Sequence, residues 1–467
     1  MKSPFAPLNK LAIVGGGPGG LMTAYLLQKA WDRPIHVTIF EASSRLGGKI
    51  MTCSFPEVGE PYEAGAAEIY DYSTVDECPL KELINELGLS TTSMGGSSVI
   101  QDQRIISNLD DLEQQLGAAA RLSLETFDRR SRDAMSPWEF YQSDEPGLIP
   151  PTAAQSSRND RFDALLDNGI THPATRRYVD HLIHSDLATE SACTTPTYGL
   201  QNYLMNHPAY MRLYSIVGGN EQLPRALAAR IHANICLEHH VVRIEATDEQ
   251  RYRVTTNSPT GQRDEQFDAV VVALPNRCLP QIQFGPSHLQ EALQRHYEYY
   301  DHPAHYLRVT LLFERPFWRG HLQDSYWMLD QFDGCCLYDE SSRIPGSIHG
   351  ILGWLLGGQS AVEMNAYSDE EIIARALDSL PDFLSAGHEQ LLAGRVHRWI
   401  DAVSAMPGGI RSRPVAERHQ PAPHSDPRLF LVGDYLFDST LNGVLDSAQY
   451  VADWLIQSIS GSQGRGT

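Results

Sequence analysis

The chain has 467 residues, of which 42% are hydrophobic, and this length allows two domains with a large buried core. Its formal net charge of −21 argues against a nucleic-acid partner and favours solubility. No run approaches the roughly eighteen apolar residues that a membrane span needs, and we expect no secretory leader. The seven cysteines lack metal-ligand spacing, so we expect no metal site and reduced thiols in the cytoplasm.

The first predicted elements are a buried strand, a glycine-rich turn and a helix. Residues 11–14 are apolar and predict a parallel strand, and residues 21–30 predict a helix. The turn between them contains the pattern G-x-G-x-x-G. Its residues are Gly15, Gly17, Pro18, Gly19 and Gly20. Such a turn lets the backbone approach a pyrophosphate held at the helix N-terminus.

A second strand and an acidic residue complete this unit. Residues 36–40 predict the strand, and Glu41 follows it, where a carboxylate can accept hydrogen bonds from both ribose hydroxyls of an adenosine. The order of these elements predicts a dinucleotide site. Beyond Glu41 the sequence fits E-x-x-x-R-x-G-G-[KR], which adds backbone N–H groups and positive charge for a diphosphate. The residues of this extension are Arg45, Gly47, Gly48 and Lys49.

The extended pattern resembles the flavin-containing amine oxidase superfamily, which includes monoamine, polyamine and L-amino acid oxidases, protoporphyrinogen oxidase and carotenoid desaturases. The resemblance implies that the cofactor is FAD rather than NAD. No cysteine stands where monoamine oxidases attach their flavin, so we expect noncovalent FAD.

Later segments resemble the superfamily in the same order. Residues 217–224 match its G-G-x-x-x-L-P turn, 236–244 its strand against the adenine, 268–275 a strand returning to the sheet, 429–434 a strand entering a glycine turn, and 442 to about 458 a helix. The resemblance implies that Asp434 contacts the diphosphate and ribityl side, and that the helix N-terminus faces the flavin. Its further cofactor contacts are Gly65, Ala66, Val241, Gly433, Gly443 and Val444.

The expected architecture is α/β, with a discontinuous Rossmann-like FAD-binding domain and an inserted α+β substrate domain. We assign residues 1–75, 215–298 and 392–467 to the first, and 76–214 and 299–391 to the second. The first insertion has mainly helical patterns with a polar break around 143–158. The second predicts strands at 306–314, 334–339 and 348–356 and a helix at 369–379.

Three positions bear on catalysis, and each departs from the oxidases that the chain resembles. Arg308 stands at the position of a catalytic lysine; an arginine cannot deprotonate, but it can orient water or bind a carboxylate. Glu68 replaces the arginine that grips the carboxylate in L-amino acid oxidases, and its charge suits a cationic amine. The expected aromatic cage is missing, and Tyr435 is our candidate for one of its rings.

These features predict an FAD-dependent oxidoreductase that oxidises an amine or amino acid derivative by hydride transfer to flavin N5. Oxygen or another acceptor would reoxidise the flavin, and a homodimer is compatible with the sequence. Two alternatives stay open. One is a desaturase or protoporphyrinogen-type dehydrogenase acting on a C–C bond, since those relatives also lack the lysine and the cage. The other is a flavin-binding protein without catalysis.

Overall fold

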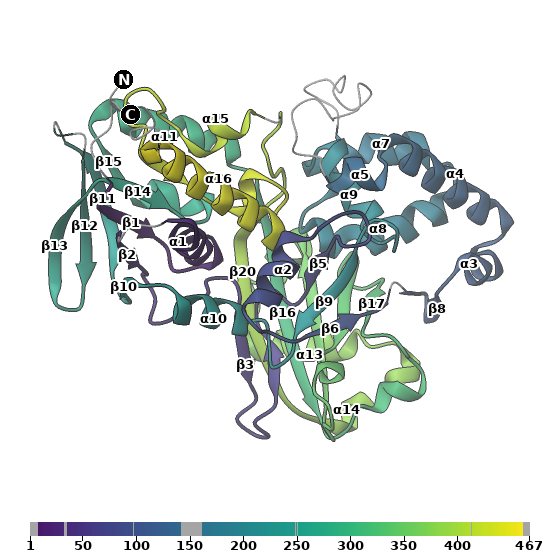
Figure 1. The fold of residues 1–467 in the computed structure, drawn as a ribbon. Coiled ribbons are helices and arrows are strands. Elements are labelled where there is room, and N and C mark those ends of the chain that lie inside the picture. The colour runs from purple at the N-terminus through teal and green to yellow at the C-terminus, as the bar shows by residue number, and fades with distance from the viewer. Residues whose placement is uncertain are drawn as a thin grey trace.

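The computed structural model describes residues 8–31, 35–96, 98–141, 161–247, 249, 251–411 and 413–460. The fold is α/β, as predicted, and its two largest sheets lie in different lobes (Figure 1). The polar break expected around 143–158 lies outside the described residues. Within the described ranges, no helix is long and apolar enough to cross a membrane.

A parallel five-stranded sheet forms the first lobe, in the order β10-β2-β1-β14-β21. Its strands are β1 (Lys10–Val14), β2 (His36–Phe40), β10 (Ala233–Cys236), β14 (Ala269–Val272) and β21 (Leu429–Leu431). Alternate residues of β1 face two different cores. Leu11 and Ile13 pack with α1 (Pro18–Ala30) and α16 (Leu441–Ser460), whereas Ala12 and Val14 pack on the other face. Burial on both faces explains the uninterrupted apolar runs.

The predicted first strand, second strand and C-terminal helix are confirmed. Helix α1 begins at Pro18, three residues before the predicted start, because proline at the first helical position fits the required φ. The single strand expected over 236–244 is wrong. Strand β10 ends at Cys236, Glu238 adopts a left-handed φ of 56°, and β11 (His240–Ala246) joins another sheet.

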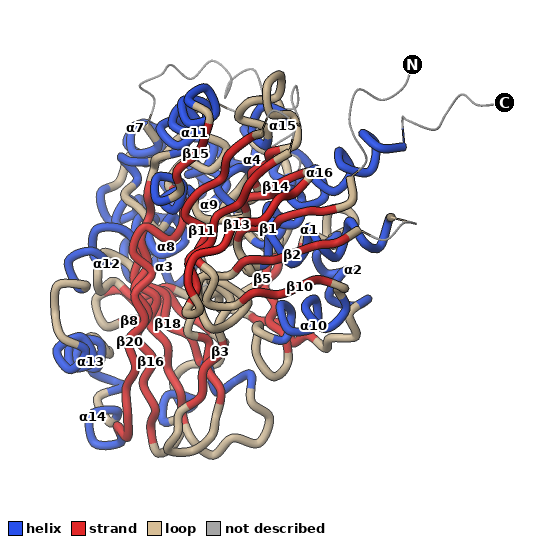
Figure 2. The backbone as a smooth tube through the Cα atoms, turned by 90° about the vertical axis from the view of Figure 1, so that its left-hand side faces the viewer, coloured by secondary structure: helices blue, strands red, loops and turns tan. Residues whose placement is uncertain are grey.

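A seven-stranded sheet dominates the second lobe, in the order β20-β16-β19-β18-β17-β7-β8. Its strands are β20 (Leu391–Ser404), β16 (Pro303–Phe313), β19 (Gly350–Gly357), β18 (Cys335–Asp339), β17 (Tyr326–Leu329), β7 (Val99–Gln101) and β8 (Arg104–Ile106). Figure 2 shows β16 and β20 running together as long strands. The strands expected at 306–314, 334–339 and 348–356 are present, whereas β17 was not predicted.

Smaller sheets and helices complete the molecule. The remaining strands are β3 (Thr52–Ser54), β4 (Pro61–Glu63), β5 (Ile69–Asp71), β6 (Thr91–Met94), β9 (Arg212–Ile216), β12 (Tyr252–Ser258), β13 (Gly261–Phe267) and β15 (Gln283–Gly285). The remaining helices include α2 (Pro79–Glu86), α3 (Leu109–Leu116), α4 (Ala118–Ala134), α5 (Pro137–Tyr141), α7 (Phe162–Gly169), α8 (Pro173–Leu187), α9 (Pro196–Leu204), α10 (Gln222–Arg230), α11 (Ser287–Tyr300), α12 (Gly358–Met364), α13 (Asp369–Asp378), α14 (Gly387–Gln390) and α15 (Val415–His419). Helix α13 is the one predicted at 369–379. The expected domain boundary near 392 falls at the start of β20, which pairs with β16.

Candidate active site

The two glycine-rich loops pack against each other beside the first strand. The Gly47 N–H donates to the Gly16 carbonyl at 2.9 Å, which ties the second loop to the first. The Arg45 guanidinium donates through Nη1 to two carbonyls within its own loop, those of Leu46 at 3.1 Å and Ile50 at 3.2 Å. Arg45 therefore shapes the second loop from inside.

Gly17 has space around it that the protein does not fill. A Cβ on Gly20 would lie 2.1 Å from the Gly15 carbonyl oxygen, so that glycine is required by the turn itself. A Cβ on Gly17 would meet only the Cα of Gly48, at 3.8 Å, although the φ of Gly17 is an ordinary −75°. Helix α1 begins at this space with no side-chain cap and no acid in its first turn. Open space and free helical N–H groups fit a pyrophosphate. We call this space, between Gly17, Gly48 and the first turn of α1, the glycine cradle.

Glu41 follows β2 beside that cradle, and its carbonyl accepts the His239 N–H at 2.9 Å, two residues before Val241. Glu41 accepts the Gly16 N–H on Oε2 and the Ser43 N–H on Oε1, each at 2.8 Å. Glu41 Oε1 also accepts the Ser43 hydroxyl at 2.7 Å, so Oε2 is the oxygen with a second lone pair to which a ribose hydroxyl could donate. Val241 is 3% exposed in β11. The residues present therefore fit the dinucleotide half of FAD.

An inner cavity of about 160 Å³ adjoins this cradle and gathers eight of the predicted site residues. Those in its wall are Pro18, Lys49, Gly65, Ala66, Glu68, Arg308, Asp434 and Val444. The Lys49 ammonium forms an ion pair with Asp434 and donates to the Ala402 carbonyl at 2.8 Å. The N-terminal turn of α16 closes one side through Leu441 and Val444. Residues from both lobes thus meet at one cavity.

Three predicted residues lie elsewhere. Gly433 and Gly443 do not line the inner cavity; a Cβ on Gly443 would lie 2.2 Å from Asp438 Oδ1, so tight packing accounts for this glycine. Tyr435 is 3% exposed, its hydroxyl lies 3.2 Å from His296 Nε2, and its ring contacts Tyr300. The structure therefore does not bring Tyr435 to the wall that Glu68 and Arg308 share.

Arg308 is completely buried, and the alternation of β16 directs it away from the hydrophobic core of this sheet. Leu307 and Val309 pack into that core, so Arg308 points to the opposite face. Its Nη2 pairs with the Glu340 carboxylate, and its guanidinium carbon lies 4.9 Å from the centre of the Tyr338 ring. Nε and Nη1 have no hydrogen-bond partner among the described residues. Arg308 is thus a fixed cation with two spare donors.

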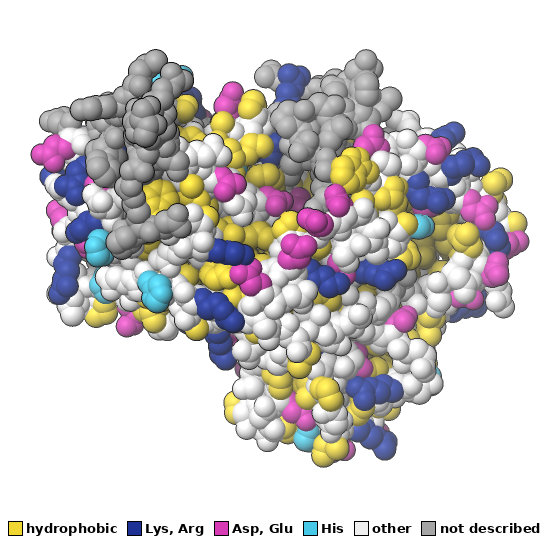
Figure 3. Space-filling model, viewed as in Figure 1, with side chains coloured by type: hydrophobic (Ala, Val, Ile, Leu, Met, Phe, Trp, Pro, Cys, Tyr) yellow, Lys and Arg dark blue, Asp and Glu magenta, His cyan; other side chains and the backbone are white. Residues whose placement is uncertain are grey.

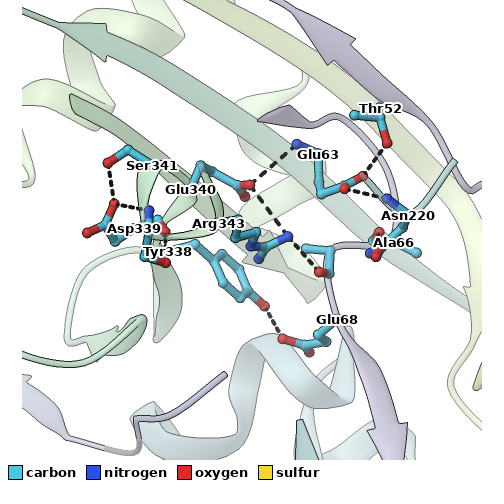
Figure 4. Close-up of polar contacts among 12 residues, drawn as sticks. Thr52, Glu63, Ala66, Glu68, Asn220, Tyr338, Asp339, Glu340, Ser341 and Arg343 are labelled. Atoms are coloured by element: carbon cyan, nitrogen blue, oxygen red, sulfur yellow. Dashed lines mark hydrogen bonds and ion pairs between the residues drawn. The ribbon is translucent and has the colours of Figure 1, made fainter. Parts of the chain in front are cut away.

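Glu68 faces the inner cavity without an ion-pair partner in the described part of the chain. It accepts a hydrogen bond from the Tyr338 hydroxyl at 2.8 Å (Figure 4). Burial raises the pKa of the Glu68 carboxyl, although the Tyr338 hydrogen bond and the charges of Arg343 and Arg308 oppose the shift. Arg343 donates to the Ala67 carbonyl at 2.8 Å and lies 3.5 Å from Glu340. Glu68 is therefore a half-buried and partly compensated acid.

Glu63 extends this buried network behind the cavity. It accepts the Asn220 N–H at 2.8 Å and the Thr52 hydroxyl at 3.0 Å (Figure 4). Burial, with the nearby charge of Glu340 and against that of Arg343, raises the pKa of Glu63 to about 7. Three glutamates thus share this region with two arginines, and the cluster favours a proton or an added cation.

An outer cavity of about 590 Å³ adjoins the inner one. Tyr70 and Tyr306 stand in both walls. Three carboxylates line the outer cavity, those of Asp186, Asp438 and Asp446, and its described wall contains no lysine, arginine or histidine. On the face shown in Figure 3, acidic side chains gather among hydrophobic ones where the two lobes meet. Such a cavity attracts cations.

The aromatic and acidic wall residues escaped the sequence analysis. Tyr70 follows Glu68 by two residues on β5, and Tyr306 precedes Arg308 by two residues on β16. Because side chains two apart in a strand share a face, applying this spacing to the candidates would have found both tyrosines. Asp186, near the end of α8, carries no local signal of this kind.

A family model and several known proteins are similar to this chain in sequence. The family model described as flavin containing amine oxidoreductase matches residues 18–456. The L-amino-acid oxidase of Mus musculus is 23% identical over 439 residues, which cover 88% of this chain and 64% of that protein. Prenylcysteine oxidase 1 of Mus musculus is 35% identical over 96 residues, 21% of this chain and 18% of that protein. The chain thus matches less than two thirds of the length of these relatives.

Two solved structures share the fold. Cyclohexylamine oxidase from Brevibacterium oxydans IH-35A superposes with a TM-score of 0.76 at 20% identity, covering 97% of this chain and 100% of that one. Wild-type putrescine oxidase bound to putrescine superposes with a TM-score of 0.73 at 19% identity and the same coverage. At these identities the likeness establishes the fold alone.

Proposed function

Because the chain belongs to the flavin-containing amine oxidoreductase family, we propose that this flavoenzyme oxidises a cationic amine or amino acid derivative. The observation that carries the proposal is the position of Glu68. It faces a cavity that begins at the glycine cradle, and no lysine, arginine or histidine of the described chain forms an ion pair with it. A half-buried carboxylate without a paired cation is stabilised by an incoming cation.

In this proposal the residues of the site have the following roles. The glycine loops, Glu41 and Asp434 hold FAD noncovalently, and FAD when bound supplies the hydride acceptor. Glu68 binds the substrate cation, and the Tyr338 hydroxyl fixes the orientation of its carboxylate. Arg308, locked by Glu340, keeps the pKa of Glu68 from rising further, since its charge favours the carboxylate. Tyr70 and Tyr306 flank the substrate and exclude water.

The proposal includes the predicted division of the chain into an FAD-binding part (1–75, 215–298 and 392–467) and a substrate-binding part (76–214 and 299–391), with one change. Residues 392–404 join the substrate-binding part, because β20 pairs with β16 in the sheet of the second lobe. The proposal also includes oxygen as acceptor, a homodimer and a cytoplasmic location. All seven cysteines are free, which supports a reducing compartment.

Anaerobic reduction of the bound flavin tests the proposed activity. We expect the purified yellow protein to release its flavin in mild acid and to bleach with at least one amine. Readmitted air should restore the colour and produce peroxide. Bleaching only by an isoprenoid or tetrapyrrole substrate would instead establish a C–C dehydrogenase. A protein that no compound bleaches would be a flavin-binding protein without catalysis.

A further inference from the structure

Strand β20 contains an irregular segment where it borders the inner cavity. In its pairing with β16, Trp399 lies opposite Tyr306, whereas Val403 lies opposite Ala304. One residue of β16 therefore spans three residues of β20. Such a β-bulge bends a strand and redirects its side chains, and bulges are common beside active sites. Here the bulge brings the neighbours Ala402 and Val403 into one cavity wall, although successive side chains of a regular strand point to opposite faces.

Asp401, at the centre of this bulge, has a strained backbone. Its φ of 56° lies in the left-handed region, which is uncommon for residues other than glycine. Such a conformation is unfavourable and persists where neighbouring contacts hold it. One of these contacts comes from His305, whose Nδ1 accepts the Asp401 N–H at 3.1 Å. His305 is itself tied to the end of α8, because its N–H donates to the Ala188 carbonyl at 2.9 Å.

The hydrogen bond from Asp401 defines the form of the His305 side chain that supports the bulge. Only an unprotonated Nδ1 can accept an N–H, so this form is the neutral imidazole with its proton on Nε2. Asp401 Oδ1 lies 3.3 Å from the same nitrogen. A protonated Nδ1 would donate to this oxygen instead and could not accept the N–H. The neutral imidazole is therefore the form that holds the backbone of Asp401.

The residue after Asp401 connects the bulge to the predicted cofactor site. The Ala402 carbonyl accepts a hydrogen bond from the Lys49 ammonium at 2.8 Å, and Lys49 also pairs with Asp434. An ammonium has three N–H donors, so one donor stays available to a bound cofactor beside these two contacts. The position of Ala402 depends on the backbone angles of the preceding Asp401. A change at Asp401 therefore moves the acceptor that orients Lys49.

We propose that His305 is a positioning residue for the cofactor site. Its neutral imidazole holds Asp401 in the left-handed conformation. Ala402 thereby keeps the Lys49 ammonium in place to contact bound FAD. This inference rests on the proposed placement of FAD beside Lys49 and Asp434, and it does not depend on which compound the enzyme oxidises.

A double-mutant cycle between His305 and Asp401 tests this role. His305→Leu removes the acceptor, and Asp401→Gly removes the need for it, because glycine adopts a positive φ without support. Dissociation constants of FAD come from fluorescence titration of the apoprotein at about pH 8, where histidine side chains are ordinarily neutral. We expect His305→Leu to raise the dissociation constant about fivefold, the effect of one lost hydrogen bond. In the Asp401→Gly background the same substitution should change it less than about twofold.

Three further variants separate positioning from a general loss of structure. His305→Asn keeps an acceptor oxygen close to the place of Nδ1, so its FAD affinity should stay within about twofold of the unaltered protein. Lys49→Met should weaken FAD binding whether or not Asp401 is replaced, since it removes the ammonium itself. The matched control is Asp102→Gly, at another aspartate with a left-handed φ, 49°, in the turn between β7 and β8 and outside both cavity walls. It should leave the dissociation constant of FAD unchanged.

Two results would overturn the assignment. One is FAD binding by His305→Leu as tight as that of the unaltered protein, and the other is a loss that Asp401→Gly does not reduce. If His305→Leu alone does not fold, recovery of a folded protein in the double variant supports the assignment, and failure to recover contradicts it. Normal FAD binding by Lys49→Met would overturn it through the placement of FAD rather than through His305. None of these measurements uses an amine, so failure of the proposed oxidation would be seen separately.

Discussion

The glycine cradle and the acidic cavity are built in opposite ways. In the cradle most polar partners are backbone groups of the two glycine loops, such as the carbonyls of Leu46 and Ile50 that bind Arg45 and the Gly16 carbonyl that binds the Gly47 N–H. In the acidic cavity the partners are far apart in sequence; Glu68 and Tyr338 are separated by 270 residues. The first region presents an unfilled space, and the second presents unbalanced charge. Short motifs can therefore specify the cradle, whereas only the assembled fold specifies the charge of the cavity.

Breaking the buried ion pair between Arg308 and Glu340 should lower the free energy of unfolding more than the other substitutions considered below. Arg308→Met leaves the Glu340 carboxylate fully buried, with Arg343 at 3.5 Å as the one cation that still pairs with it among the described residues. Loss of one partner of a buried pair costs about 3–5 kcal/mol, so we expect a loss of that size in the free energy of unfolding. Denaturant unfolding at matched FAD saturation measures it. The double variant Arg308→Met, Glu340→Gln should lose less than Arg308→Met alone. A loss below about 1 kcal/mol for the single variant would mean that Arg343 and the Glu63 N–H, which lies 3.4 Å from Glu340, satisfy this carboxylate without Arg308.

Glu63 should make the stability of the protein depend on pH. Its pKa is about 7 in the folded protein against 4.5 ordinarily, so the folded state holds this proton more tightly than the unfolded chain. The resulting stabilisation is fully present below about pH 4.5 and is lost as the pH rises through about 7. It amounts to at most about 3 kcal/mol. In unfolding experiments from pH 5 to 8, Glu63→Gln should remove most of this decline, because glutamine stays neutral. An unchanged pH dependence in the variant would assign the decline to other groups.

The same contrast explains what the sequence could predict. The parallel strands β1 and β2, the glycine loops and the membership of Lys49 and Asp434 in one site follow from local motifs and a family resemblance. The burial of Arg308 does not, because alternation alone cannot tell a solvent face from a second buried face. The partner of Arg308 is 32 residues away in a short helical turn after β18, and no spacing rule connects them. The role of Asp186 in the outer cavity is harder still to predict, because what distinguishes it is that the described wall of this cavity contains no lysine, arginine or histidine.

Substitution of Gly17 in the cradle should change the stability of the protein least. It should also distinguish a residue that the fold requires from a residue that FAD binding requires. Because a Cβ on Gly17 meets no protein atom closer than 3.8 Å, we expect Gly17→Ala to leave the stability of the FAD-free protein within about 0.5 kcal/mol. The same methyl group occupies space that the pyrophosphate needs, so the dissociation constant of FAD should rise about tenfold or more, about 1.4 kcal/mol. Fluorescence titration of the apoprotein with FAD measures the second quantity, and thermal unfolding without FAD measures the first.

Gly20→Ala is the matched comparison for Gly17→Ala. Its Cβ would lie 2.1 Å from the Gly15 carbonyl oxygen, so this methyl group should destabilise the protein even without FAD. A lower melting temperature for the FAD-free Gly20→Ala variant, beside an unchanged one for Gly17→Ala, would separate the glycine that the turn requires from the glycine that the cofactor requires. If Gly17→Ala binds FAD as tightly as the unaltered protein does, the pyrophosphate does not occupy the open space at α1, and the cradle must be placed elsewhere along the loops.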